Sequence, residues 1–149
     1  MARTILVING PNLNLLGARE PHIYGRATLD DIKVACVGRA KERDLTIDFR
    51  QSNAEGEIIG WIQAARGNSD GIIINAAGYT HTSIAIMDAL SAADQPVIEV
   101  HISNIFKRED FRHHSYISAV ATGVICGLGP HGYLLAIDAM ADLVTKAKA

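Results

Sequence analysis

This sequence has few cysteines, few long apolar runs and little excess of charge of either sign. Each of these features argues against a class of protein. The two cysteines, Cys36 and Cys126, have no C-x-x-C partner and no metal-ligand spacing, which argues against a disulfide framework. The longest early apolar run, residues 4–8, is too short for an export signal or a membrane span. We therefore expect a cytoplasmic protein that enters no membrane and packs both cysteines as small core residues.

Charge is nearly balanced, with 14 Lys and Arg residues against 16 Asp and Glu residues and a pI near 6.3. That balance lacks the basic surface of a nucleic-acid-binding protein, so no nucleic acid partner is expected. Of the 149 residues, 48% are hydrophobic, which is enough for a folded core and too many for a disordered chain. We expect a single domain over residues 1–149.

Short β-branched runs alternate with segments of helical periodicity along the whole chain. Strands are expected at residues 3–9, 45–50, 71–75, 96–101 and 121–126, and helices at 28–43, 52–66, 80–92 and 132–146. Thr28 is suited to cap the first helix, and Ser52 with Glu55 predicts a capping box at the second. Several strands carry Ile or Val on both faces, which indicates a parallel sheet covered on both sides. The expected fold class is α/β, a flavodoxin-like three-layer sandwich with strand order 2-1-3-4-5.

Two connections are longer than this alternation requires. Residues 10–25 and residues 103–118 each follow a strand, whereas connections in such folds usually run about two to six residues. Both loops leave the carboxyl edge of the predicted sheet, which is where ligands bind in parallel α/β folds. We therefore expect the functional site there.

The sequence motifs give little support for a nucleotide, flavin or zinc site. The segment GLGPHG at residues 127–132 matches a dinucleotide fingerprint by letters, but no later strand completes the βαβ unit. We interpret it as a turn with a Pro near the helix start. Asn9 and Asn75 stand where a phosphate-accepting site would need aspartates, and His113 and His114 lack further ligands at zinc spacing. No bound cofactor or metal is expected.

Glu99, His101 and Ser103 alternate along one face of the fourth expected strand. A carboxylate in a strand fit for burial needs a partner, and His101 is suited to be that partner. In one interpretation Glu99 orients His101 as a general acid or base near neutral pH. In the other, the two residues form a structural pair at the end of the strand.

Cationic side chains gather in both long loops. Arg19 and Tyr24 share the first loop, and Arg108 and Arg112 would face the same way if residues 106–115 formed a helix. About one tyrosine in a thousand is ionised at pH 7, so Tyr24 acts as a base only if guanidinium groups stabilise its phenolate by about 4 kcal/mol. Otherwise Tyr24 packs within its loop, and the two arginines pair with carboxylates at the surface.

Neutral hydrogen-bonding side chains follow the first and third strands, namely Asn12, Asn14, Asn75, Tyr79 and His81. Such groups suit a polyhydroxylated ligand better than a nucleotide base. Asp88 lies two helical turns after His81 and points along the third expected helix. By itself Asp88 is typical of a surface charge.

Four stretches closely resemble the type II 3-dehydroquinate dehydratase family. They are GPNLNLLGAREPHIYG at residues 10–25, QSNAEGE at 51–57, NAAGYTHTS at 75–83, and EVHISN at 99–104 followed by residues 108–115. Lys107 stands where members of the family often have alanine, and it removes no expected group. The resemblance implies a cofactor-free hydro-lyase that converts 3-dehydroquinate to 3-dehydroshikimate through an enolate, the third step toward chorismate and the aromatic amino acids.

The resemblance also implies a role for each matching residue. Tyr24 corresponds to the base that takes a proton beside the ketone, and Arg19 to the arginine that keeps it ionised, with Arg108 in support. Asn12 corresponds to the residue that steadies the enolate. The first loop then acts as a lid, and no lysine Schiff base is required.

On the opposite side of the substrate, His101 corresponds to the acid that protonates the departing hydroxyl, with Glu99 holding it. The implied substrate-binding groups are the side chains of Asn75, His81 and Arg112 and the main-chain amides of Ile102 and Ser103. Asp88 corresponds to a residue that reaches a neighbouring subunit's site. This implies a trimer as the smallest active unit and a homododecamer built as four trimers.

Two other functions stay open on the residues alone. A flavodoxin-like module could bind a small carboxylated polyol without turnover, and a nucleotide-dependent reductase could use the same fold. Formation of a conjugated enone from 3-dehydroquinate distinguishes the dehydratase from the first of these. A flavin or a nicotinamide requirement would identify the second.

Overall fold

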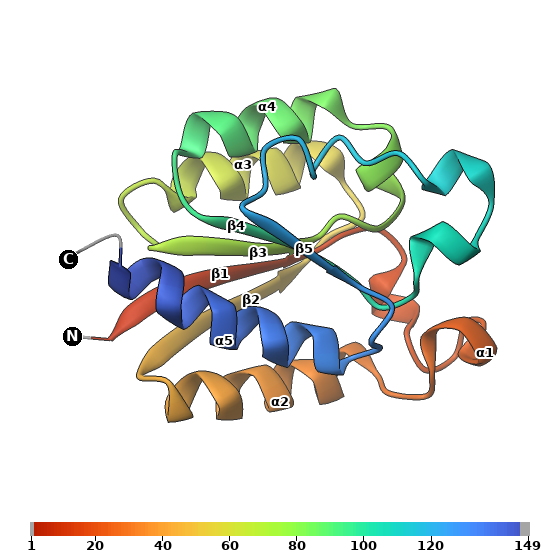
Figure 1. The fold of residues 1–149 in the computed structure, drawn as a ribbon, viewed down its shortest axis with the longest axis horizontal. Coiled ribbons are helices and arrows are strands. Elements are labelled where there is room, and N and C mark those ends of the chain that lie inside the picture. The colour runs from red at the N-terminus through yellow and green to blue at the C-terminus, as the bar shows by residue number, and fades with distance from the viewer. Residues whose placement is uncertain (1, 147–149) are drawn as a thin grey trace.

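In residues 2–146, which the computed structural model describes, five parallel strands form one sheet in the order β2-β1-β3-β4-β5 (Figure 1). The strands are β1 (Arg3–Asn9), β2 (Leu45–Gln51), β3 (Gly71–Asn75), β4 (Val97–His101) and β5 (Gly123–Cys126). The predicted fold class and strand order are confirmed. The run of β-branched residues in β1, β3 and β4 suits strands that are covered on both faces.

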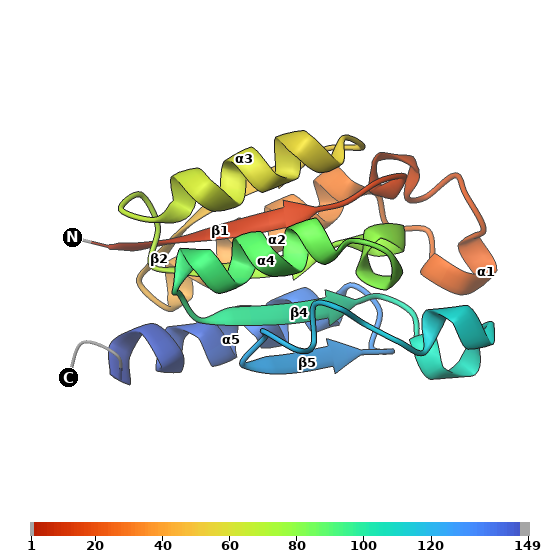
Figure 2. The same ribbon diagram turned by 90° about the horizontal axis from the view of Figure 1, so that it is seen from above.

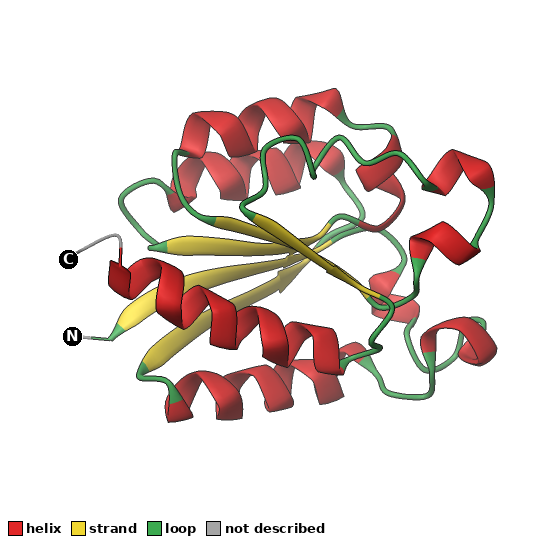
Figure 3. Cartoon of the chain, in the orientation of Figure 1, coloured by secondary structure: helices red, strands yellow, loops and turns green. Residues whose placement is uncertain are grey.

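Helices cover both faces of the sheet (Figure 1 and Figure 3). On one face lie α2 (Leu29–Glu42) and α5 (His131–Lys146), and on the other lie α3 (Glu55–Ala65) and α4 (Ile84–Ala93). The loops contain the short turns α1 (Pro21–Tyr24), η1 (Leu13–Leu15), η2 (Ala77–His81), η3 (Ile105–Lys107) and η4 (Asp110–Arg112). Figure 2 shows these turns gathered beyond the carboxyl ends of the strands. Within residues 2–146, no helix combines the length and apolarity needed to span a bilayer.

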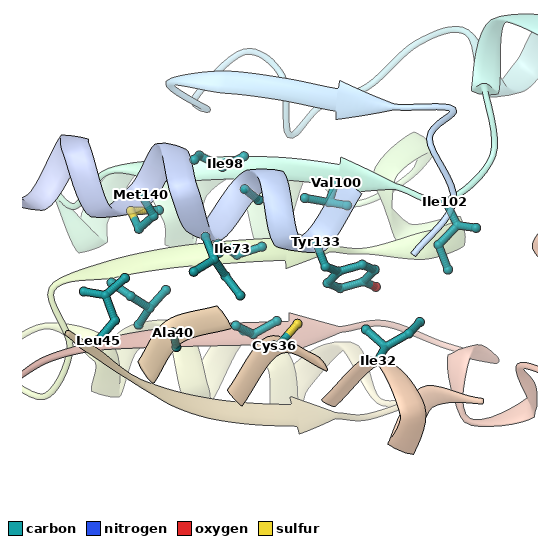
Figure 4. Packing of buried hydrophobic residues seen from close by; sticks show 14 of the residues in the cluster. Ile32, Cys36, Ala40, Leu45, Ile73, Ile98, Val100, Ile102, Tyr133 and Met140 are labelled. Atoms are coloured by element: carbon teal, nitrogen blue, oxygen red, sulfur yellow. The ribbon is translucent and has the colours of Figure 1, made fainter. Parts of the chain in front are cut away.

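The alternation of side chains along β1 divides the core between the two faces of the sheet. Ile5 and Val7 belong to the cluster shared with α2 and α5, whereas Leu6 and Ile8 belong to the cluster shared with α3 and α4. Figure 4 shows the first cluster, in which Cys36 of α2 is fully buried. The prediction that Cys36 is a core residue is confirmed.

β5 is the edge strand and is more exposed than predicted. It begins at Gly123 rather than at residue 121, and Val124 is 45% exposed. An edge strand has a neighbour on one side only, so its side chains receive less cover. Cys126 is half-buried for this reason, and the prediction that it is a core residue is wrong.

The start of α3 also differs from the prediction. The Ser52 hydroxyl accepts a hydrogen bond from the Ala54 N–H (2.9 Å), and α3 begins at Glu55 without a capping side chain. Ser52 closes a tight turn before the helix, so the predicted capping box is wrong. At α2 the predicted cap is confirmed, because Thr28 and Asp31 exchange hydrogen bonds in a capping box.

α4 begins four residues later than predicted. The Ser83 hydroxyl accepts from the Ile86 N–H (2.9 Å) and caps the helix, which starts at Ile84. Thr80 lies instead in η2, one of the loop turns. The difference matters because η2 places Tyr79 and His81 at the sheet edge rather than along a helix.

A buried hydrogen-bonded chain joins the carboxyl ends of β1, β2 and β3. The Tyr133 hydroxyl, on α5, donates to Asn9 Oδ1 (2.7 Å) and accepts from Asn75 Nδ2 (3.1 Å). Asn9 Nδ2 donates in turn to the Arg50 carbonyl (3.0 Å). Burial raises the pKa of the Tyr133 phenol, so the hydroxyl keeps the proton that it donates. The fold therefore fixes the side-chain amides of Asn9 and Asn75 at this edge of the sheet.

The first long loop starts from a very close approach of two chain segments. The Gly10 N–H donates to the Asn75 carbonyl (2.8 Å), and a Cβ built on Gly10 would lie 2.4 Å from the Ala76 carbonyl oxygen. Only glycine fits at that position. The loop therefore leaves β1 directly against the end of β3.

Replacing Tyr133 by Phe keeps the ring packing and removes one hydroxyl. We expect a loss of about 1–3 kcal/mol in the free energy of unfolding, because Asn9 Oδ1 and Asn75 Nδ2 stay buried without that partner. Urea unfolding measures the change. Tyr116→Phe is the matched control, because the Tyr116 hydroxyl makes no hydrogen bond to any residue in the described range. Equal stability of the two variants would contradict the role of the buried chain.

Candidate active site

A cleft opens at the carboxyl edge of the sheet, between the two long loops. Ten of the twelve predicted site residues line it, namely Asn12, Arg19, Tyr24, Asn75, His81, His101, Ile102, Ser103, Arg108 and Arg112. Glu99 lies directly behind His101 and is fully buried. Asp88 is exposed on α4 and does not line the cleft. The fold thus brings together residues that lie up to 100 positions apart in the sequence.

Tyr24 is the residue on which the two long loops meet. The Arg108 guanidinium donates to the Tyr24 hydroxyl (Nη1 to Oη, 2.8 Å). The guanidinium carbons of Arg108 and Arg19 lie 5.3 and 5.5 Å from the centre of the Tyr24 ring. Two guanidinium groups therefore lie against Tyr24, and one of them is hydrogen-bonded to its hydroxyl. The contact at the hydroxyl comes from Arg108, whereas the resemblance gave Arg19 the leading part.

A short turn presents Tyr24 to the cleft. Pro21 starts α1, which ends at Tyr24 because Gly25 follows with a φ of +82°. Glu20 precedes the turn with a φ of +43°. The chain therefore reverses on both sides of a single helical turn, and Tyr24 is carried at its end.

The predicted partnership of Glu99 and His101 is present. Glu99 Oε2 is paired with His101 Nε2, and both side chains are almost fully buried. Ser115 Oγ donates to the same carboxylate oxygen (2.8 Å), and Ser118 Oγ donates to Oε1 (2.5 Å). Burial raises the pKa of the Glu99 carboxyl, but the hydrogen bonds from His101, Ser118 and Ser115 outweigh burial and hold that pKa below its ordinary value. Glu99 is therefore an anion behind the imidazole.

The pairing leaves one nitrogen of His101 for the cleft. Nε2 faces Glu99, and Nδ1 has no hydrogen bond to any residue among 2–146. An imidazole held by a carboxylate at one nitrogen can deliver a proton from the other when it is protonated. This is the geometry expected of a general acid.

Asn12 is held in a left-handed conformation, with a φ of +69°. Its N–H donates to Asn53 Oδ1 (2.9 Å), and the Gln51 amide donates to Asn53 Oδ1 (3.2 Å) and to the Gly10 carbonyl (3.2 Å). The Tyr79 hydroxyl donates to the Asn53 carbonyl (2.7 Å). Asn53 and Gln51 thus position Asn12, a role that the sequence analysis missed. Their place in the QSNAEGE stretch was the available signal.

His81 and Asn75 present neutral groups to the cleft. The His81 Nδ1–H donates to the His114 carbonyl (2.8 Å). Burial lowers the pKa of His81, with the nearby charges of His101 and Arg112 acting in the same direction. Asn75 Oδ1 accepts from the Ala77 N–H (3.1 Å), which fixes the amide against the backbone. Such groups suit a ligand with hydroxyls.

The segment carrying Arg108 and Arg112 is not the helix considered above. Residues 105–107 and 110–112 form two separate turns, η3 and η4, with Arg108 and Glu109 extended between them. Both arginines nevertheless line the cleft. Glu109 is their carboxylate partner, 3.1 Å from the Nε of Arg112 and 3.7 Å from that of Arg108. The arrangement leaves both guanidinium groups at a site suited to an anion.

The glycine-rich segment at residues 127–132, after β5, is hydrogen-bonded to the main chain of cleft residues. The Gly127 N–H donates to the His101 carbonyl (3.2 Å), and the Gly129 N–H donates to the Ile102 carbonyl (3.0 Å). Gly127 has a φ of +86°, and Pro130 immediately precedes α5. The interpretation of this segment as a turn agrees with these contacts. Within residues 2–146, no three His, Cys, Asp or Glu side chains gather closely enough to hold a metal ion.

Comparisons with known proteins agree over almost the whole chain. Residues 3–141 match the family described as Dehydroquinase class II. The chain is 57% identical over 142 residues to the "3-dehydroquinate dehydratase 2" of Pseudomonas aeruginosa, covering 95% of this chain and 96% of that one. It is 58% identical over 146 residues to the "3-dehydroquinate dehydratase" of Brucella canis, covering 98% and 93%. The crystal structure of the type II dehydroquinase from Propionibacterium acnes superposes with a TM-score of 0.92 at 48% identity, covering 95% and 98%.

The lowered pKa of Glu99 predicts how stability depends on pH. The folded state binds the Glu99 proton more weakly than the unfolded chain does, so the contribution is complete above the ordinary value of 4.5 and is lost as the pH falls below it. We expect Glu99→Gln to be less stable than the parent at pH 7 and to lose less stability between pH 5 and pH 3. Urea unfolding at each pH measures this.

Glu57→Gln is the matched control, because Glu57 is exposed in the first turn of α3. This variant should follow the pH dependence of the parent. An acid slope in Glu99→Gln as steep as in the parent would mean that the buried carboxylate does not stabilise the fold.

Proposed function

The chain belongs to the class II dehydroquinase family, and from this premise we propose a mechanism in which Tyr24 removes a proton and His101 supplies one. The activity is that of a hydro-lyase, a 3-dehydroquinate dehydratase, and it belongs to the shikimate pathway. The proposal concerns which residues of this chain do the work. The observation that carries it is the Tyr24 hydroxyl, held by Arg108 at the same cleft as the carboxylate-paired His101.

The first step needs a base beside the ketone of the substrate. The Tyr24 phenolate takes the proton from the carbon next to the ketone, and the electron pair of that C–H bond forms an enolate. Arg108 and Arg19 stabilise the phenolate before the step, and Asn12 steadies the oxygen of the enolate. The positioned base supplies about 10²–10⁴ in rate.

The second step expels the hydroxyl. The electron pair of the enolate forms the new C=C bond as the C–O bond breaks, and His101 gives its proton to the departing oxygen, which leaves as water. Glu99 stabilises the imidazolium before this transfer. A base and an acid complete the elimination, so the proposed chemistry calls for no cofactor.

Neutral and cationic side chains hold the substrate in this scheme. The hydroxyls are bound by Asn75, His81 and Arg112, and the carboxylate by the main-chain amides of Ile102 and Ser103. All five residues line the cleft. Residues 10–25 form the lid: Gly17 and Gly25, with φ values of +92° and +82°, allow the turns on either side of Arg19 and Tyr24.

The proposal includes the assembly and the setting of the enzyme. Each subunit acts as one domain over residues 1–149 in the cytoplasm, as trimers that associate into a homododecamer. The outer face of α4 supports the contact between subunits, because Ile84 is 52% exposed and Asp88, one turn later, is exposed beside it. Asp88 reaches the cleft of a neighbouring subunit in this arrangement.

Tyr24→Phe keeps the ring and removes the base. We expect kcat to fall by about 10²–10⁴, with the binding of a substrate analogue changed no more than a few fold. The absorbance of the conjugated enone product measures turnover. Tyr116→Phe serves as the control, since Tyr116 does not line the cleft. Near-normal turnover in Tyr24→Phe would remove Tyr24 as the base, and a parent protein without turnover would favour the binding module.

Asp88→Ala tests the shared site. We expect a smaller assembly by light scattering, or a raised KM in an unchanged assembly, because the carboxylate is missing from the neighbouring cleft. Asp142→Ala, which alters a carboxylate on α5, is the comparison variant. Parent-like mass and kinetics in Asp88→Ala would contradict the contact across subunits.

A further inference from the structure

The carboxylate of Glu99 carries more hydrogen bonds than its pairing with His101 requires. Ser115 Oγ donates to Oε2 and Ser118 Oγ donates to Oε1, at 2.8 and 2.5 Å. Glu99 is fully buried, so water does not supply these bonds. Two hydroxyls from one short segment thus replace the solvent around the anion behind the imidazole.

The segment that carries these hydroxyls is firmly attached to the fold. Ile117, between the two serines, is fully buried in the cluster beneath α3 and α4. The Tyr116 N–H donates to the Thr80 carbonyl (3.0 Å). Ser115 Oγ accepts from the Ser118 N–H (3.1 Å), which leaves the Ser115 hydroxyl proton directed to Glu99. The geometry of both donors is therefore set by backbone contacts and by a core side chain.

We propose that Ser115 and Ser118 are positioning residues that act through Glu99 to make His101 a stronger acid. The inference rests on the proposed function, in which His101 protonates the departing hydroxyl. The pair of Glu99 and His101 is neutral overall when the imidazole is protonated and carries one negative charge after the proton has left. Hydrogen bonds to the carboxylate are stronger in the second state, so the two serines favour release of the proton.

Other titratable or charged groups lie near the same pair. His81 on η2 interacts electrostatically with His101 and Glu99, Arg112 on η4 lines the same cleft, and Cys126 of β5 is paired with His101 in the sheet. Among residues 2–146, neither serine side chain is hydrogen-bonded to any of these three groups. Burial raises the pKa of the Glu99 carboxyl, and the hydrogen bonds from both serines lower it. This direction agrees with the proposal.

The test compares Ser118→Ala with Ser118→Thr. Threonine keeps the hydroxyl, and its additional methyl group can be accommodated because residue 118 is exposed. Ser69→Ala is the control, because the Ser69 hydroxyl lies beside Gln95 at the opposite edge of the sheet. We expect kcat at pH 7 to fall about 3- to 10-fold in Ser118→Ala and to be restored in Ser118→Thr. The alkaline limb of the kcat profile should move to higher pH by about 0.5–1, since the imidazole holds its proton more tightly.

A second measurement does not depend on turnover. NMR titration of the His101 imidazole, assigned by its absence in His101→Gln, should show a midpoint about 0.5–1 higher in Ser118→Ala and higher again in Ser115→Ala/Ser118→Ala. A parent protein without turnover would defeat the proposed function, while this titration would still decide the inference. Unchanged midpoints in both variants, with thermal unfolding showing that they are folded, would overturn it. A lower kcat with no change in the pH profile or in the NMR titration midpoint would also overturn the inference, because it would indicate a purely structural effect of the substitution.

Discussion

A buried negative charge in the middle of a covered sheet is the constraint on which this site depends. β4 is packed on both faces, so the carboxylate of Glu99 cannot be solvated and has to find donors within the protein. His101, Ser115 and Ser118 are those donors. Satisfying the carboxylate therefore brings residues 115–118 against the strand and holds the imidazole at the wall of the cleft. In the proposed mechanism, the same requirement that stabilises the fold also prepares the acid.

Hydrogen bonds between neutral groups fix another part of the site. Tyr133 joins Asn9 and Asn75 at the carboxyl ends of β1 and β3, and Asn53 Oδ1 accepts a hydrogen bond from the main-chain N–H of Asn12. Neutral partners of this kind fix the geometry without adding net charge, so the arginines make the main contribution to the electrostatic potential of the cleft.

In the proposed mechanism the base lies where the two long loops touch. Tyr24 and Arg108 are separated by 84 positions in the chain and by 2.8 Å between their hydrogen-bonded atoms. A tyrosine without such a neighbour keeps its proton at neutral pH. In the proposed mechanism residues 10–25 carry the base, so a movement of this loop would also change the distance between Tyr24 and Arg108.

Hydrophobic periodicity and motif residues were enough to predict the layers, the strand order and much of the site. The period of two in β1 and β4 places Ile5 and Leu6 on opposite faces and Glu99 and His101 on the same face, and no distant contact is needed for that. The resemblance located the cleft residues because their motifs stand on loops that follow predicted strands. Thr28 was predicted as the cap of α2, and the hydrogen bonds that it exchanges with Asp31 lie within a single helical turn.

Which of these residues contact one another depends on interactions that form only in the folded chain. The hydroxyl of Tyr24 meets Arg108 rather than Arg19, Asn53 positions Asn12, and the serines of residues 115–118 reach Glu99. Ser52 differs from these residues because its hydroxyl accepts a local hydrogen bond from the Ala54 N–H and closes a turn where a helix cap was expected. Loops have no periodicity that would indicate their partners, and their conformations follow from contacts with distant segments of the chain. The chemistry of this site is made of such contacts, which is why residue types and spacing alone did not specify it.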